Sequence, residues 1–150
     1  MKKLFTLFLS TVLILAFTGC NNSKTDQQID SSSIIIPINL TFSLLDADGD
    51  ELTLDDFTPI KDEAFIAEEG VSVLDATQLF CMSHDLSITV DRDNGYVTEI
   101  DGLTAGDYSD QTGWIFLVNG QMGNMTAEEQ ILNDGDSITW EFVDAATYPW

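Results

Sequence analysis

The 150-residue chain carries 26 acidic residues and five basic ones, which gives a formal net charge of −21. A surface with this charge repels nucleic acid and anionic lipid headgroups, so the composition excludes both as electrostatic partners. The length is sufficient for one small domain with a single hydrophobic core.

The first residues have the organisation of an export signal. Lys2 and Lys3 precede an uncharged, mostly apolar run over residues 4–17. This run is shorter than the roughly 20 residues that a helix needs to span a bilayer. A short apolar segment behind two lysines therefore predicts a signal peptide over residues 1–19 rather than a transmembrane helix.

Cys20 closes a motif that resembles the bacterial lipobox. Thr18 and Gly19 are small residues ahead of the cysteine, while Phe17 stands where the lipobox has an aliphatic residue. The resemblance implies cleavage before Cys20 and attachment of lipid to its thiol. Since two acyl chains hold a protein on a bilayer and one chain binds only marginally, we expect an exported protein anchored to the cell membrane and facing outside the cytoplasm. The alternative is an ordinary cleaved signal, with Cys20 incidental.

Residues 20–33 are polar and show no hydrophobic period, which predicts a flexible tether between the lipid and a domain over residues 34–150. Removal of the signal peptide leaves three basic and 26 acidic residues, a formal charge of −23. With Cys20 lipidated, Cys81 has no partner for an intramolecular disulfide. We expect Cys81 to be a small core residue on a helix.

The first half of the domain begins with alternating apolar and polar residues over residues 38–44, which predicts a half-buried strand. Residues 46–50 form an Asp-Gly turn signal. Leu52 and Leu54 suggest a short strand, and residues 63–67 a returning strand.

A helix is predicted after Ser72, which has the spacing of an N-cap with Asp75 as its partner. The helix should extend to about Met82, with one apolar face toward the core.

The second half of the domain alternates strand and turn signals. Strands are predicted over residues 86–90, 96–100, 114–118 and 137–142, a polar loop over residues 103–112, and a short helix over residues 126–132. One main helix among several short strands indicates an α+β domain in which the helix packs on one face of a small mixed sheet.

Four motifs in a fixed order resemble the transcobalamin C-terminal-like domain, a family of β-grasp type that includes the C-terminal domains of transcobalamin and intrinsic factor. These motifs cover residues 72–76, 95–103, 113–120 and 134–142. The resemblance extends over about residues 40–142 and implies a β-grasp-like fold.

The resemblance also implies a ligand, because in the vertebrate carriers this domain closes over cobalamin bound to a large helical barrel domain. A corrinoid or another flat ligand would lie near Gly113 and Trp114, with Tyr96 and Phe116 as the adjoining aromatic residues. The chain is too short to contain the helical barrel. A transporter or another surface protein would therefore have to supply the second wall of the site.

The sequence offers few residues for catalysis. His84 is the only histidine and lies one helical turn after Cys81, so a Cys-His pair is conceivable, but a helix-end histidine is the favoured interpretation. The acidic residues around Asp48 and Asp91 lack the EF-hand spacing, so no standard metal site is predicted, and a non-standard calcium site stays open.

We therefore expect a non-enzymatic, lipid-anchored binding module on the cell surface. The alternative is a structural or adhesive surface protein whose acidic face engages a protein partner without a small ligand.

Overall fold

The computed structural model describes residues 32–44, 51–55 and 57–149. The predicted signal peptide, Cys20, most of the predicted tether and the turn over residues 46–50 lie outside the described residues. No helix in the described part of the chain combines the length and the apolar character needed to cross a membrane.

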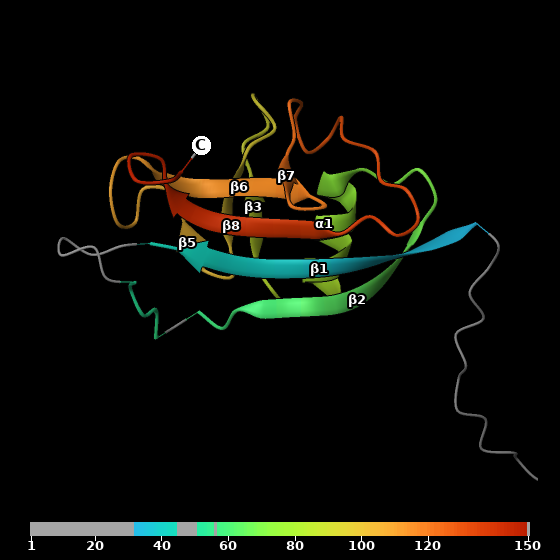
Figure 1. Ribbon diagram of the computed structural model, residues 1–150, viewed down its shortest axis with the longest axis horizontal. Helices are drawn as coiled ribbons and strands as arrows, with labels where there is room; N and C mark the ends of the chain where they lie inside the picture. Colours follow the sequence, from blue (N-terminus) through green and yellow to red (C-terminus); the bar gives the residue numbers. More distant parts are fainter. Residues whose placement is uncertain (1–31, 45–50, 56, 150) are drawn as a thin grey trace, which may run out of the picture.

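A five-stranded mixed sheet forms one layer of the domain (Figure 1), in the order β2-β1-β8-β6-β7. The strands are β1 (Ser33–Ser43), β2 (Ile60–Glu68), β6 (Thr112–Val118), β7 (Gln121–Met122) and β8 (Ile138–Asp144). β1 and β8 are parallel, whereas the other neighbouring pairs are antiparallel.

The second layer lies against one face of this sheet. It contains α1 (Val73–Ser83) and a three-stranded antiparallel sheet of β3 (Ile88–Val90), β4 (Val97–Ile100) and β5 (Leu103–Thr104), as Figure 1 shows. The predicted α+β class, with one main helix on one face of a small mixed sheet in a β-grasp-like arrangement, is confirmed.

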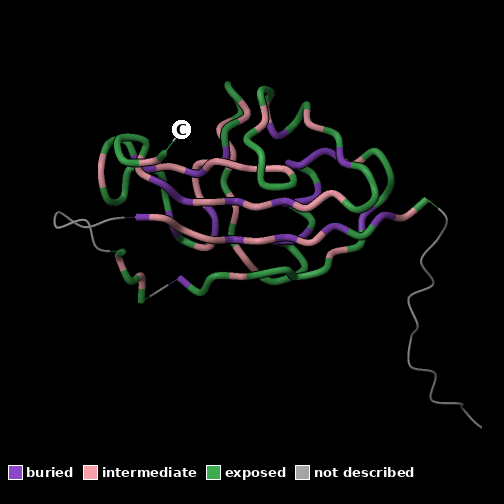
Figure 2. The backbone as a smooth tube through the Cα atoms, viewed as in Figure 1, coloured by how far each residue is buried: buried purple, intermediate pink, exposed green. Residues whose placement is uncertain are grey.

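Side-chain alternation along the central strands explains the two layers. In β1, Ile36 and Ile38 are fully buried, whereas Ile35 between its buried neighbours is 41% exposed. Figure 2 shows buried positions alternating with more exposed positions along β1 and β8. The period of two predicted from residue 38 begins earlier, because β1 starts at Ser33, the last residue of the predicted tether.

The main helix begins as predicted. The Ser72 hydroxyl oxygen accepts a hydrogen bond from the Asp75 N–H at 3.0 Å, which satisfies one of the free donors of the first helical turn. The Asp75 carboxylate accepts a hydrogen bond from the same hydroxyl at 2.9 Å instead of reaching the Ser72 backbone. The helix ends at Ser83, one residue beyond the predicted end.

Three predicted elements were wrong: a strand at Leu52 and Leu54, a loop over residues 103–112 and a helix over residues 126–132. Leu52 and Leu54 lie outside any strand, and the Leu52 N–H donates to the Leu44 carbonyl in an otherwise irregular segment. The segment predicted as a loop over residues 103–112 opens with the short strand β5.

Residues 126–132 form turns instead of the predicted short helix. Two long-range backbone bonds explain the difference: the Val73 N–H donates to the Gln130 carbonyl, and the Leu132 N–H donates to the Val71 carbonyl. These bonds hold the segment alongside the start of α1, and the Leu132 N–H is a group that a helix over residues 126–132 would have bonded internally. Tertiary pairing therefore overrides the local helical pattern.

A buried hydrogen bond between β8 and α1 helps to join the two layers. The Trp140 indole N–H on β8 donates to the Thr77 hydroxyl oxygen on α1 at 2.8 Å, and that hydroxyl donates to the Val73 carbonyl at 2.7 Å. Trp140 is 2% exposed and Thr77 is fully buried, so water cannot replace either partner.

We predict that Thr77→Val lowers the free energy of unfolding by about 1–3 kcal/mol, because it leaves the buried indole N–H without an acceptor. Urea denaturation would measure the change. Thr77→Ser is the matched control: it keeps the hydroxyl, removes one methyl group and should cost roughly 1 kcal/mol or less. Equal stability of the two variants would contradict this role for the hydrogen bond.

Candidate functional site: a groove at the edge of β6

An open groove of about 490 Å³ lies where β6, the start of β4 and the loop after β7 meet. Tyr96, Trp114 and Phe116, three of the four predicted ligand-binding residues, line it together. Gly113, the fourth, does not line the groove, and a Cβ atom at this position would stand 3.9 Å from the Ala105 side chain. The structure thus brings most of the predicted site to one place.

The groove follows the backbone edge of β6. Trp114 and Phe116 lie on the face of the sheet that the second layer covers, and their rings pack against those of their β8 neighbours, Phe142 and Trp140, at centroid distances of 5.3 and 5.4 Å. Ile115 lies between them on the strand and therefore points to the opposite face. Trp114, Ile115 and Phe116 all line the hollow although their side chains point to alternate faces of the sheet. The hollow therefore runs along the backbone edge of β6.

Trp114 forms the inner wall of the groove. Only 8% of the residue is exposed, and its indole N–H donates to the Leu103 carbonyl at 2.8 Å. Its polar group is therefore already satisfied, and most of its surface packs in the core. Trp114 can present only a limited apolar surface to a ligand, and Trp140, which also lines the groove, is more deeply buried at 2% exposure.

The rim of the groove holds the accessible apolar surface. Tyr96, Met122 and Met125 are 65%, 45% and 44% exposed, and all three line the hollow. Methionine side chains are flexible and polarisable, which suits them to contacts with aromatic or irregular apolar partners. Glu129 is the charged residue among the lining residues, and no lining residue is basic.

Gly123 allows the loop after β7 to lie close to Phe116. A Cβ atom at this position would stand 3.3 Å from two carbon atoms of the Phe116 ring, a distance that requires the ring or the loop to move. The absence of a side chain therefore sets the width of the groove at this point.

Sequence reasoning missed the methionines and Gly123. The available signal was the two methionines closely following the Asn119-Gly120 turn, since exposed methionines are uncommon on a polar loop. Their relation to Tyr96 depends on the packing of two sheets and has no local signature.

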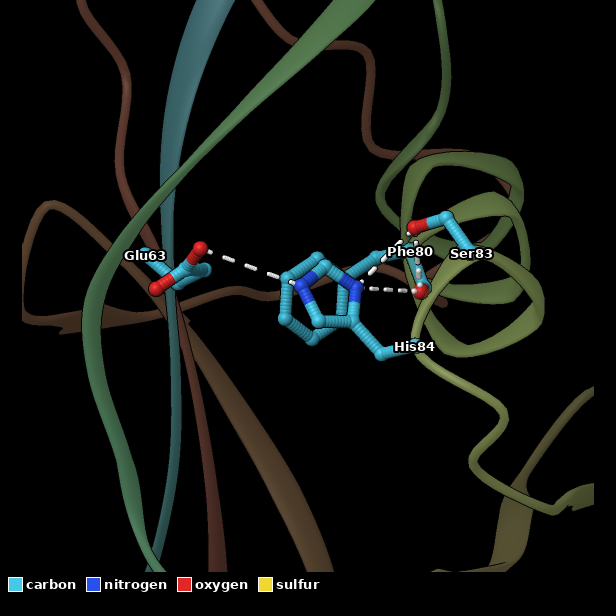
Figure 3. A network of polar contacts seen from close by, with 4 residues as sticks. All are labelled: Glu63, Phe80, Ser83 and His84. Atoms are coloured by element: carbon cyan, nitrogen blue, oxygen red, sulfur yellow. Dashed lines mark hydrogen bonds and ion pairs between the residues drawn. The ribbon is translucent and has the colours of Figure 1, made fainter.

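His84 and Cys81 do not form a pair. Figure 3 shows His84 at the end of α1: its Nε2 lies 3.8 Å from a Glu63 carboxylate oxygen, and its Nδ1 lies 3.0 Å from both the Ser83 hydroxyl and the Phe80 carbonyl. Its ring stacks on Phe80 with a centroid distance of 4.1 Å. These contacts are those of a helix-terminating histidine.

The Cys81 thiol is fully buried, as predicted for a core residue. Burial, together with the negative charges of Asp101 and Glu99, raises the pKa of the thiol to about 11. Because the thiolate is the nucleophilic form, Cys81 is poorly suited to attack a substrate at neutral pH.

We predict that Cys81 reacts with a thiol-specific chromogenic disulfide at pH 8 far more slowly in the native protein than in urea. The reaction should be followed on a Cys20→Ser background so that Cys81 is the only thiol. The raised pKa also makes the free energy of unfolding depend on pH. Because the folded state favours the protonated thiol, this contribution to stability is present below the unfolded pKa and declines as pH rises toward 11. Native reactivity equal to that of the unfolded chain would contradict the burial.

Within residues 32–44, 51–55 and 57–149, no group of three or more His, Cys, Asp or Glu side chains could hold a metal ion. The Asp91 carboxylate is engaged inside its own turn, where it accepts hydrogen bonds from the Asp93 N–H at 2.9 Å and from the Asn94 amide at 2.7 Å. This supports a turn-forming role for the acidic residues after β3.

The fold and the groove define a small α+β domain of β-grasp type with an apolar groove at a sheet edge. A family model, "Domain of unknown function (DUF4430)", matches residues 70–144, half of the chain. The protein therefore belongs to this family. No curated protein matches the chain.

The solved structures that are similar to the chain include two at low identity. One is a crystal structure of a candidate metal-binding protein from Ruminococcus gnavus, with 18% identity, a TM-score of 0.44, and coverage of 73% of this chain and 98% of that one. The other is haptocorrin in complex with Cbi, with 17% identity, a TM-score of 0.48, and coverage of 73% of this chain. The chain spans only 25% of the length of the haptocorrin chain.

Proposed function

We propose that this protein is a non-enzymatic binding module, anchored outside the cytoplasm by lipid on Cys20, which captures a small apolar ligand in the groove at the edge of β6. The observation that carries the proposal is the exposure of Tyr96, Met122 and Met125 around one hollow whose inner wall is Trp114. Apolar side chains gathered around a concave surface are the usual composition of a small-molecule site.

A corrinoid is the ligand that the transcobalamin-like motifs favour, since three of the four matching positions line the groove. A flat macrocycle would lay one face on Tyr96 and the two methionines. Small-molecule sites usually bury about 70–90% of a ligand's surface, which an open groove on one protein cannot do for a molecule of this size. A transporter or surface protein would therefore provide the second wall.

We predict that cobinamide or cobalamin quenches the fluorescence of Trp114 and Trp140, both of which line the groove. Tyr96→Ala and Met125→Ala should each weaken binding by about tenfold, the usual effect of truncating a central contact. Met82→Ala is the matched control, because Met82 is 71% exposed on α1 away from the groove. N-acetyltryptophanamide titrated in parallel corrects for light absorbed by the corrinoid.

Unchanged tryptophan emission at micromolar corrinoid, or equal weakening by Met82→Ala, would contradict a corrinoid site in the groove. The first result would favour the alternative of an adhesive surface protein. For that function, the exposed pair Ile35 and Ile66, cross-strand neighbours on the outer face of the sheet, offers a contact surface.

Lipid attachment at Cys20 can be tested separately from ligand binding. Cells fed an alkyne-tagged fatty acid should label the wild-type protein, which should sediment with membranes, whereas Cys20→Ser should be unlabelled and soluble. Cys81→Ala is the matched control, because it removes the other cysteine and should keep both label and membrane association. Retention of membrane association by Cys20→Ser would contradict lipid anchoring.

A further inference from the structure

β6 has one fully paired edge and one edge that is mostly free. All seven of its residues pair with β8, whereas only Leu117 and Val118 pair with β7 on the other side. In Figure 1, β6 lies at the border of the five-stranded sheet opposite to β2, with the short β7 at one end.

Neighbouring bonds fix the direction of each backbone group on this strand. The Asn119 N–H donates to the Ser137 carbonyl on the β8 side, and the Thr112 carbonyl accepts from the Gly106 N–H on the opposite side. Because backbone direction alternates along a strand, even-numbered residues of β6 direct their N–H and C=O groups away from β8. Trp114 and Phe116 are therefore the residues that face the free edge.

In the part of the chain that the structure describes, the N–H and C=O groups of Trp114 and Phe116 have no hydrogen-bond partner. The gap is closed at one end by the Gly106–Thr112 bond and at the other by the first β7 pair, Leu117 with Met122. Between these two limits, the free edge of β6 is long enough to pair with a strand of only about four residues.

The groove lies along this same edge, since Trp114, Ile115 and Phe116 all line it. A free row of backbone donors and acceptors beside apolar pockets is the arrangement that binds an extended peptide as an added strand. We propose that the free edge of β6 binds a short extended segment of a second protein, with alternating apolar and basic side chains, as an additional strand of the sheet.

The side-chain chemistry of the groove selects the composition of the segment. Residues that point into the groove would meet Phe116, Met122 and Met125, which favours apolar side chains. The chain has 26 acidic residues and five basic ones, and Glu129 lines the groove, which favours lysine or arginine at the outward positions of the segment. A second copy of this chain carries the same excess of negative charge, so repulsion disfavours it as the donor of the strand.

This inference deepens the proposed function, because it names the kind of contact that the partner protein makes at the groove. It does not require a corrinoid to bind. A peptide titration contains no corrinoid and the corrinoid titration contains no peptide, so either result can fail while the other holds.

The test uses a fluorescein-labelled heptapeptide in which lysine alternates with isoleucine, titrated into the protein and followed by anisotropy. Two further peptides carry N-methyl groups on the isoleucine nitrogens or on the lysine nitrogens. All three have the same charge and side chains, so they differ only in which backbone donors are blocked. A strand added to one edge donates from alternate residues only.

We expect micromolar binding of the parent peptide, a loss of at least about tenfold for one N-methylated peptide, and affinity close to that of the parent for the other. Met125→Ala should weaken binding of the parent peptide, and Met82→Ala should leave it unchanged. Equal affinity of the two N-methylated peptides would overturn the proposal, because side chains and charge would then explain the binding. Absence of parent-peptide binding at millimolar concentration would overturn it as well.

Discussion

The parallel pairing of β1 with β8 is the constraint on which the rest of the structure depends. It joins residues 100 positions apart, such as Ile38 and Ile138, and puts the last strand of the chain in the middle of the sheet. With β8 held between β1 and β6, its buried face is covered by α1 through the Trp140–Thr77 bond. The same placement moves β6 outward, where only a two-residue strand covers its far side. The free edge and the groove are therefore consequences of the central pairing.

Local patterns in the sequence predicted those elements whose hydrogen bonds are local or whose burial alternates. The N-cap Ser72 and the alternating residues of β1 and β6 belong to this group, because a helix start and a half-buried strand each impose a short-range pattern. The segment over residues 126–132 was mispredicted because its backbone pairs with residues at and just before the start of α1, more than 50 positions away. β7 was missed because two residues beyond a tight turn carry no period.

The candidate site was predictable in part for the same reason. Tyr96, Trp114 and Phe116 stood out as aromatic residues within recognisable motifs, and the structure places them around one hollow. Trp114 is more deeply buried than a ligand contact requires, because its indole N–H is bonded to the Leu103 carbonyl and its ring packs in the core. Gly113, beside it, does not line the groove, and a Cβ atom there would lie next to Ala105. The exposed methionines complete the site, and their position follows from how the loop after β7 crosses Phe116, which no short-range pattern encodes.

The central claim is that Trp114 and Phe116 present unpaired backbone groups along a usable edge. Amide hydrogen exchange in the free protein, resolved by residue, tests it most directly. We predict fast exchange for Trp114 and Phe116, and slow exchange for Ile115 and Leu117, whose N–H groups face β8. Slow exchange at all four amides would contradict the account, because it would mean that the outer edge of β6 is already paired.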